Sequence, residues 1–338
     1  MKIKTNQMWL LLDSSKLGGI ESHVFQLAKG LHSLGENIQV IFLNNYGNHP
    51  LRNALLENGI PTTSLDGRIG SLRNLMKIER PTIVHTHGYK AGILGRLMSK
   101  VYKIPSVSTF HAGEISTGKL GLYQWLDEKS AKLSSHLFAV SPQIASKLPS
   151  NTQVFDNFVD TNNINTSNGD QIAFVGRLSK EKGADYFLEL AVLFPKLSFH
   201  IYGDGPLRQE LESSAPSNVI FHGQQDNMST VWLSIGLLIM PSRNEGLPMA
   251  ALEAMARGIV VLASNVGALN KVVDSNINGW LTPSGNISAL SDYLSQWIDM
   301  DKTTRLQFSK EARSKIEQQF SAQVAIPKLI ACYKRLAQ

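Results

Sequence analysis

The sequence has very little cysteine and no long apolar run. Its 338 residues include one cysteine, Cys332, which excludes an intramolecular disulfide and a structural metal site built from clustered cysteines. The apolar run Met8–Leu12 is too short for the core of a signal peptide, and the run 231–240 is too short for a membrane span. These absences predict a protein of the reducing cytoplasm.

The glycine-rich loops lack the dinucleotide-binding fingerprint. Gly18-Gly19 follows a predicted strand and opens a helix, as does the second loop at Gly203 and Gly205. Backbone N–H groups at such turns can approach an anion closely. Neither loop continues as G-x-G-x-x-G; in the second loop Arg208 stands where the third glycine would be. The missing fingerprint disfavours a dehydrogenase. Each loop taken alone also fits a simple strand–helix turn.

Short apolar segments alternate with helical patterns along the whole chain. This alternation predicts parallel sheets that are covered by helices on both faces. The predicted strands are 8–12, 38–43, 82–86, 106–110, 137–140 and 153–155, then 172–175, 198–201, 219–221, 237–240 and 260–263. Helices are predicted at 20–34 in the first half and at 287–297, 302–319 and 322–336 at the end of the chain.

A polar segment rich in Asn and Ser, residues 161–170, interrupts the pattern and predicts a linker. It separates one domain at 1–160 from a second at 171–320, and residues 321–338 are expected to form a helix that packs back on the first domain. The expected fold class is α/β, with two Rossmann-like, doubly wound domains facing a cleft. Ligands of such sheets bind beyond the carboxyl ends of the strands.

Two cations follow a predicted strand in the second half. Arg177 comes directly after Gly176, and Lys182 precedes the next helix. Arginine supplies a planar fork and lysine a point charge, a combination that suits a diphosphate. Charge alone would favour two solvated surface residues, but their position beside a glycine at a strand end favours the diphosphate.

Two glutamates flank the start of another helix. Glu253 is the one polar residue of the apolar stretch 247–256, where a carboxylate needs hydrogen-bond donors such as a ribose diol. Glu245 precedes the helix and could accept from sugar hydroxyls, or could simply favour the helix start. The spacing is not diagnostic, because Glu181 and Glu189 repeat it, but only Glu245 and Glu253 are accompanied by the glycine, the proline and the apolar helix.

Together these residues resemble glycosyltransferase family 4, the retaining GT-B enzymes, of the type that builds bacterial surface polysaccharides. The resemblance extends from the Gly18-Gly19 loop to Gly279. It is carried by that loop and by the segments 84–87 (Val-His-Thr-His), 108–111 (Ser-Thr-Phe-His), 139–141 (Ala-Val-Ser), 174–183, 203–206 and 245–258. The combination is highly specific, although no single segment is.

The resemblance implies roles for the matching side chains. Arg177 and Lys182 would neutralise the donor diphosphate, and Glu253 would hold the ribose. Glu245 would bind hydroxyls of the transferred sugar, and His111 would contact the sugar near its reacting carbon. A lone histidine at a strand end is also a common structural residue, so both interpretations of His111 remain open.

The resemblance also implies backbone contacts with the donor. Gly19 would approach the diphosphate from the N-terminal domain, and the segment around Gly223 would contact the base. The remaining members of the expected nucleotide-sugar site are Gly18, Gly176, Gly203, Gly205, Gly246 and Leu247. In such enzymes the leaving phosphate accepts the acceptor's proton, so no protein nucleophile is expected.

The implied enzyme is a metal-independent hexosyltransferase without a cofactor. Its donor would be a nucleotide-diphosphate sugar, with UDP favoured by the flanks of Glu245, and the sugar a hexose or N-acetylhexosamine. The acceptor, a glycan or a lipid-linked glycan, would bind the N-terminal domain, and no nucleic-acid partner is expected.

Three alternatives remain. A GT-A transferase needs an Asp-x-Asp at a strand end, but the one match, Asp299-Met300-Asp301, lies between two predicted helices, where Asp301 suits a helix cap. A GT-B epimerase would share the fold and most of the site. A non-catalytic nucleotide-sugar sensor would share the binding residues but would not release the nucleotide.

The net charge of +6 lies in the first half of the chain. Residues 1–160 hold 17 Lys and Arg against 11 Asp and Glu, whereas the rest of the chain is balanced. Helical spacing predicts two helices, each with a basic face opposite an apolar one. The basic faces would either dock on the anionic inner face of the cytoplasmic membrane or simply face solvent. The basic residues are Arg73, Lys77 and Arg80, and then Arg96, Lys100 and Lys103; the apolar residues opposite the second face are Ile93, Leu94, Leu97 and Val101.

Overall fold

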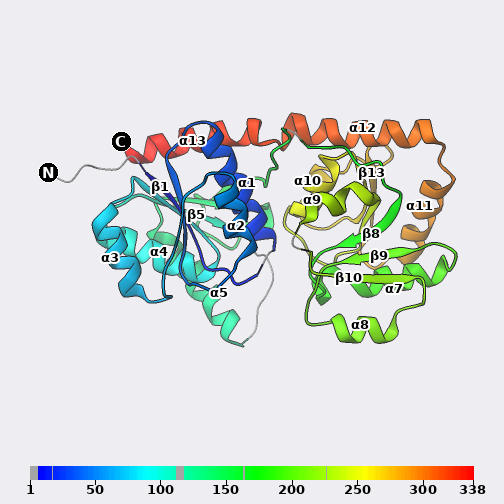
Figure 1. Cartoon of the computed structure of the whole chain (residues 1–338), viewed down its shortest axis with the longest axis horizontal. Coiled ribbons are helices and arrows are strands. Elements are labelled where there is room, and N and C mark those ends of the chain that lie inside the picture. The colour runs from blue at the N-terminus through cyan, green and yellow to red at the C-terminus, as the bar shows by residue number, and fades with distance from the viewer. Residues whose placement is uncertain (1–6, 17, 112–117, 163, 226) are drawn as a thin grey trace. The chain divides into compact units, whose positions relative to one another are not determined.

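The computed structural model describes residues 7–16, 18–111, 118–162, 164–225 and 227–338, and it divides into two compact units (Figure 1). Unit 1 comprises Met1–Asp160 together with Ala322–Gln338, and unit 2 comprises Thr161–Ser321. The polar segment 161–170 therefore belongs to unit 2, and the C-terminal helix belongs to unit 1.

Unit 1 is built on a parallel sheet in which the strand order is β3-β2-β1-β4-β5-β6-β7. Successive residues of β1 point to opposite faces, so that Met8, Leu10 and Leu12 enter one apolar core and Trp9 and Leu11 another. The strands are β1 (Met8–Leu12), β2 (Ile38–Phe42), β3 (Thr62–Ser64), β4 (Ile83–His87), β5 (Ser106–Phe110), β6 (His136–Ala139) and β7 (Gln153–Val154).

Helices cover both faces of this sheet (Figure 1). On one face lie α1 (Gly19–Ser33), α2 (Pro50–Glu57) and α13 (Ala322–Ala337). On the other lie α3 (Ile69–Glu79), α4 (Tyr89–Tyr102) and α5 (Gly118–Ser130), followed by η1 (Ala131–Leu133), with α6 (Pro142–Ala145) after β6. Gly30 lets α1 and α13 approach closely, because a Cβ there would meet Ile326 Cγ1 at 2.8 Å.

Unit 2 repeats the architecture with a parallel sheet in the order β10-β9-β8-β11-β12-β13. Its strands are β8 (Gln171–Val175), β9 (Phe199–Tyr202), β10 (Val219–Gly223), β11 (Ile235–Met240), β12 (Val260–Ser264) and β13 (Gly279–Thr282). Its helices are η2 (Lys180–Lys182), α7 (Ala184–Leu193), α8 (Arg208–Ser214), α9 (Met228–Val231), η3 (Trp232–Ser234), α10 (Met249–Met255), η4 (Leu269–Lys271), α11 (Ile287–Asp299) and α12 (Lys302–Gln319).

The predicted fold class, two doubly wound α/β sheets, is confirmed. Strands β1 and β5 and helix α12 have the predicted bounds, and the other predicted strands shift by one or two residues. Two strands, β3 and β13, were not predicted. They have three and four residues and stand at sheet edges, where a short segment carries little periodicity.

Candidate functional site

The predicted site residues of unit 2 gather at the point where the strand order reverses. After β8 the chain moves to β9 on one side, and after β11 it moves to β12 on the other, while β8 and β11 are hydrogen-bonded neighbours. Arg177 follows β8 and Glu245 follows β11. The loops beyond β8 and β11 therefore form the edge at which open α/β sheets bind ligands.

Lys182 and Glu245 meet directly, although they lie far apart in the sequence. Lys182 Nζ donates to Glu245 Oε1 at 2.8 Å and to Oε2 at 2.7 Å, and Ser242 Oγ donates to Oε1 at 2.8 Å. The Glu245 side chain is 4% exposed, against 26% for Lys182. A carboxylate has about four acceptor positions and an ammonium three donors, so each group retains one for a ligand.

Glycines allow the loops of this edge to touch through their backbones. Gly183 has φ +68°, and a Cβ there would collide with the carbonyl oxygen of Pro241, in the loop that carries Glu245. Gly203 has φ +141°, and a Cβ there would collide with the carbonyl of Gly176. Gly205 approaches the backbone of Leu178 in the same way. The Arg177 loop is thus held against both neighbouring loops.

The two predicted diphosphate cations differ in their surroundings. Arg177 is exposed, whereas Lys182 is held by Glu245. A third cation, Arg243, was not predicted: its guanidinium donates to Asp185 Oδ1 at 2.7 Å and lies 3.8 Å from the centre of the Tyr186 ring. The hydrogen bonds to Asp185 raise the pKa of Arg243. Its backbone N–H donates to Glu181 O at 2.7 Å, which ties the Glu245 loop to η2.

Glu253 lies half-buried on α10 and has a donor that the sequence did not reveal. Trp232 Nε1 donates to Glu253 Oε2 at 3.2 Å, and Trp232 is fully buried on η3. Arg257 donates to the Glu253 carbonyl at 2.8 Å. The carboxylate on this apolar helix is therefore held by an indole from 21 residues earlier in the chain.

The remaining predicted residues of unit 2 complete the same edge. Gly223 ends β10 with φ +72°, and its carbonyl accepts from Gly203 N at 2.8 Å. The carbonyl of Gly246 accepts from Ala268 N at 2.8 Å. Leu247 is buried at the start of α10.

In unit 1, Gly18 caps α1 and Gly19 begins it, beyond the carboxyl end of β1. A Cβ on Gly19 would meet nothing within 4 Å, so the backbone there is open to a ligand. Glu21, which was not predicted as a site residue, lies in the first turn of α1. Burial raises its pKa, although a hydrogen bond with Ser14 opposes this.

Three histidines of unit 1 come together at the same edge of the sheet. His87 ends β4, His111 follows β5 and His23 lies on α1. His87 Nδ1 and His111 Nε2 are 3.1 Å apart, and one nitrogen from each of the three rings lies within 4.8 Å of the others. Burial lowers the pKa of His23 to about 4 and those of His87 and His111 well below 6.5. All three imidazoles are therefore neutral at neutral pH.

The sequence did not predict this group of three possible metal ligands. Each histidine was considered singly, whereas the parallel pairing of β4 with β5 brings His87 and His111 together. Neutral imidazole is a ligand for zinc, copper and nickel. The neighbouring His85 is buried between Thr109 Oγ1 at 2.7 Å and the hydroxyl of Tyr333 on α13.

The predicted basic face of α4 is wrong at Arg96. Arg96 is 1% exposed and forms an ion pair with Asp127 of α5, so it does not face solvent. Leu97 and Val101, which were expected to be buried, are exposed. The small residues Gly92 and Gly95 face inward instead, where a Cβ on Gly95 would meet Leu11 Cδ2 at 2.8 Å.

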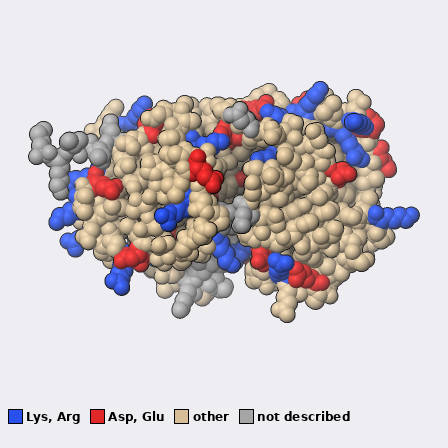
Figure 2. Space-filling view, in the orientation of Figure 1, with Lys and Arg blue, Asp and Glu red and all other residues tan. Residues whose placement is uncertain are grey.

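The other predicted basic residues are exposed: Arg73 and Lys77 on α3, Arg80 beyond its end with φ 48°, and Lys100 and Lys103 at the end of α4. Figure 2 shows Lys and Arg side chains along the margin of unit 1 that carries α3. Among the residues that the structure describes, no helix combines the length and the apolarity that a membrane span requires.

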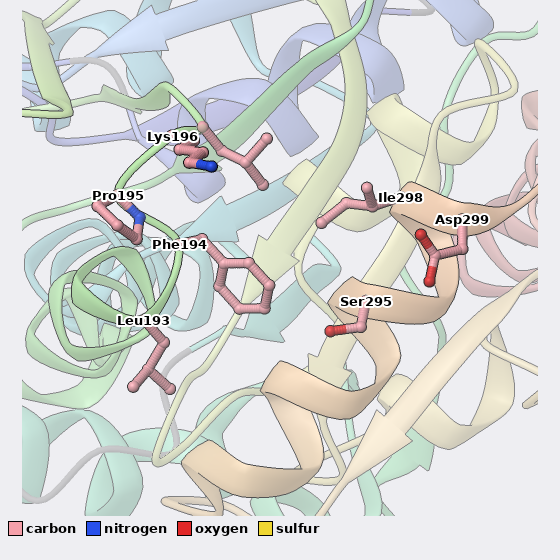
Figure 3. A pocket seen from close by; sticks show the side chains of 8 residues that line it. Leu193, Phe194, Pro195, Lys196, Ser295, Ile298 and Asp299 are labelled. Carbon is pink, nitrogen blue, oxygen red and sulfur yellow. The ribbon is translucent and has the colours of Figure 1, made fainter.

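A pocket of about 340 Å³ lies elsewhere in unit 2, and Figure 3 shows the side chains that line it. It is lined by Phe194 and Lys196, which precede β9, and by Ile298 and Asp299 at the end of α11. Phe194 and Lys196 precede the amino end of β9, whereas the predicted site residues follow the carboxyl ends of the strands. The pocket is therefore separate from the candidate site.

The fold and the charged switch-point edge define a two-domain α/β protein of the GT-B class. Residues 17–163 match the model of Glycosyltransferase Family 4, and residues 157–315 match that of Glycosyl transferases group 1. Between them the two models cover nearly the whole chain. The chain belongs to the family 4-like GT-B glycosyltransferases, so it is a transferase of the class that the sequence predicted.

The relatives include a UDP-Gal:alpha-D-GlcNAc-diphosphoundecaprenol alpha-1,3-galactosyltransferase of Escherichia coli, which is 27% identical over 78% of each chain. Another is the gpi3 subunit of the phosphatidylinositol N-acetylglucosaminyltransferase of Schizosaccharomyces pombe, 27% identical over 83% of this chain and 71% of its own. Among solved structures, Anabaena HepE in complex with UDP-glucose superposes with a TM-score of 0.84 at 18% identity, covering 97% of this chain and 99% of its own.

Proposed function

We propose that the protein transfers a hexose or N-acetylhexosamine, with retention, from a UDP-sugar to a glycan or lipid-linked acceptor in polysaccharide or glycolipid synthesis. The observation that carries the proposal is the Lys182–Glu245 pair, held beside the exposed Arg177 at the switch point of unit 2. The name of the Escherichia coli relative supports a UDP-sugar donor and a polyprenyl-linked acceptor, and HepE supports UDP as the nucleotide.

In this proposal unit 2 holds the donor through fixed charges. Arg177 and the third proton of Lys182 bind the diphosphate, and their charge stabilises the phosphate oxygen as its bond to the anomeric carbon breaks. The acceptor oxygen forms the new bond to that carbon on the same face, and its proton passes to the leaving phosphate. Glu253, held by Trp232, accepts from the ribose hydroxyls. The one remaining acceptor position of the Glu245 carboxylate accepts a hydrogen bond from a hydroxyl of the transferred sugar.

The proposed chemistry needs no divalent cation, because protein cations already neutralise the diphosphate. The roles of Gly19 and His111 in unit 1 stay predictions that follow from the resemblance. The histidine cluster of unit 1 could take a metal, which would occupy one nitrogen of His111. Turnover should therefore survive EDTA, and added Zn²⁺ should inhibit by capturing His111 rather than activate.

The experiment is a thermal-shift comparison of UDP-, GDP- and ADP-sugars, followed by an assay for nucleotide release with membrane extract as acceptor. Stabilisation by one UDP-sugar, with release of UDP in the presence of EDTA, is expected. Activity that is lost in EDTA and restored by Mn²⁺ would refute metal independence. Interconversion of UDP-sugars without UDP release would identify an epimerase.

A further inference from the structure

Helices α4 and α5 of unit 1 are built with charge inside and apolar side chains outside. Arg96 of α4 and Asp127 of α5 are both buried and form an ion pair. The guanidinium also donates to Ser108 Oγ at 3.0 Å and to Ser130 Oγ at 2.8 Å. This is the reverse of a surface helix, which normally buries its apolar stripe and exposes its charges.

The apolar residues that this arrangement leaves outside form one stripe on each helix. On α5, Leu122, Trp125 and Leu126 follow the spacing i, i+3, i+4, and on α4, Leu97 and Val101 follow i, i+4. The exposed fractions are 60% for Leu122, 53% for Trp125, 37% for Leu126, 42% for Leu97 and 59% for Val101, and the neighbouring Tyr123 is 45% exposed. We call these six residues the α4–α5 apolar face.

The two stripes lie side by side. A Cβ on Gly92 would collide with Asp127, and one turn later Arg96 reaches Ser130. The two helices also connect successive parallel strands, α4 from β4 to β5 and α5 from β5 to β6, and they contact each other, so they run parallel on one face of the sheet. Their carboxyl ends meet at the same end of the apolar face.

Basic side chains gather at that end. Lys100 and Lys103 of α4 and Lys129 and Lys132 of α5 and η1 are all exposed. The acidic residues of α5 do not balance them: Asp127 is paired with Arg96, and Glu128 is half-buried and accepts from Gln124 at 3.2 Å. Within the described residues of α4, α5 and η1, the exposed charge is therefore positive.

We propose that the α4–α5 apolar face inserts into the surface of an anionic lipid bilayer, with the four lysines against the headgroups. Tryptophan and tyrosine favour the boundary between headgroups and acyl chains, and lysine is attracted to anionic headgroups. A second copy of the chain fits this face less well, because the same face of that copy carries lysines and no exposed carboxylate to pair with them within the described residues of α4, α5 and η1. The inference rests on the proposed function in one respect: a lipid-linked acceptor lies in the membrane, so the enzyme must bind there to reach it.

The test uses the full chain with vesicles of phosphatidylcholine, alone or mixed with phosphatidylglycerol. Of the five tryptophans, Trp9, Trp232, Trp280 and Trp297 are buried and Trp125 is exposed. Anionic vesicles should therefore shift the tryptophan emission to shorter wavelength through Trp125, and the Trp125→Phe variant should lose the shift. High salt should weaken cosedimentation because it screens the lysines.

The decisive variant is Leu122→Ser/Trp125→Ser, which changes two exposed side chains. Its binding to anionic vesicles should fall by about tenfold or more, because the apolar area that enters the bilayer is lost. The control is Val192→Ser/Leu306→Ser, which changes exposed apolar residues of unit 2 and should bind like the wild type. Lys100→Gln/Lys129→Gln should reduce the preference for anionic vesicles, and Arg73→Gln/Lys77→Gln/Arg80→Gln should have a smaller effect.

Equal binding by the Leu122→Ser/Trp125→Ser variant and its control would overturn the proposal. Dimers of the wild type that this variant abolishes in sedimentation velocity would also overturn it, in favour of self-association. Calorimetry with UDP separates this inference from the proposed function, since the surface variants should bind UDP normally. A wild-type chain that binds UDP but not anionic vesicles would overturn the membrane role alone, and a wild-type chain that binds the vesicles but not UDP would overturn the proposed donor site alone.

Discussion

The two units place different chemistry at the same position of the same kind of sheet. In unit 2 the edge beyond the strands carries charges that are already paired, Lys182 with Glu245 and Arg243 with Asp185. In unit 1 the corresponding edge carries His23, His87 and His111, whose pKa values burial lowers so that they are neutral. Doubly wound sheets thus fix where a ligand binds, and the loop residues decide which ligand.

The contrast follows from what each edge must bind in the proposed reaction. A diphosphate carries charge, and fixed cations with fixed counterions meet it without reorganising. Sugar hydroxyls are neutral, and neutral imidazoles can both donate to them and accept from them. Mutations at each edge and a change of pH test whether the two units differ in this way.

The largest effect is expected where charge is removed from unit 2. Arg177→Ala should lower turnover by on the order of 10²–10³ with an unchanged melting temperature, because Arg177 is exposed. Lys182→Met should lower turnover similarly and also destabilise unit 2 by about 3 kcal/mol, because it leaves the buried Glu245 carboxylate without its cation. Steady-state kinetics and thermal unfolding measure the two effects. A folded Arg177→Ala enzyme with near-full turnover would contradict the assignment.

Acid should destabilise unit 1 more than unit 2. A histidine whose folded pKa is about 4, such as His23, binds fewer protons when folded than when unfolded. Its stabilisation is complete above about pH 6.5 and is lost as the pH falls towards 4, at roughly 1.4 kcal/mol per pH unit. His85, His87 and His111 act in the same direction. Burial raises the pKa of Asp127 to about 6 and also raises those of Glu21 and Glu79, and these three carboxyl groups oppose the four histidines in part.

Hydrogen exchange read by mass spectrometry checks this expectation peptide by peptide. Between pH 7 and pH 5, after correction for the intrinsic exchange rate, unit 1 should lose more protection than unit 2. His23→Leu should reduce the difference. Equal loss in the two units, or earlier opening of unit 2, would contradict the comparison.

Nucleotide affinity should depend on Glu253 and not on Glu189. Glu253→Gln should weaken UDP binding by roughly 1–3 kcal/mol, the range for a hydrogen bond to a charged group. Glu189 is exposed on α7, and Glu189→Gln is its matched control, with no change expected. Equal losses of affinity in calorimetry would refute the ribose assignment.

A smaller effect is expected at Trp232, which orients Glu253 and is not predicted to touch the nucleotide. Trp232→Phe removes the indole N–H and should weaken UDP binding by about 1 kcal/mol. In the Glu253→Gln background the same change should add little, because the two residues act together. Full additivity in this double-mutant cycle would show that Trp232 acts independently of Glu253.

Local patterns in the sequence predicted most of the fold and the position of the unit 2 candidates after the ends of their strands. Alternating apolar segments located the strands, and strand-end glycines beside charged residues located Arg177, Lys182 and Glu245. Pairing across long separations was not predictable: Lys182 and Glu245 were placed near one ligand, yet their direct contact spans 63 residues. The partner of Glu253 was missed for the same reason.

The error on α4 has a similar physical cause. Helical spacing can show that Arg96, Lys100 and Lys103 share a face, but it cannot show that Asp127 lies 31 residues later on the adjacent helix to neutralise Arg96. The histidine cluster did leave a signal. His87 and His111 end similar segments on consecutive predicted strands, and neighbouring parallel strands would have brought them together.

The central claim is that protein cations in unit 2, and not a metal, hold the donor diphosphate. Calorimetric titration of UDP into the wild-type chain, in excess EDTA and then with Mn²⁺, tests it most directly and needs no acceptor. The account predicts saturable binding with the same affinity in both buffers, and weaker binding by the Arg177→Ala variant. Absence of UDP binding, or binding only in the presence of Mn²⁺, would contradict it.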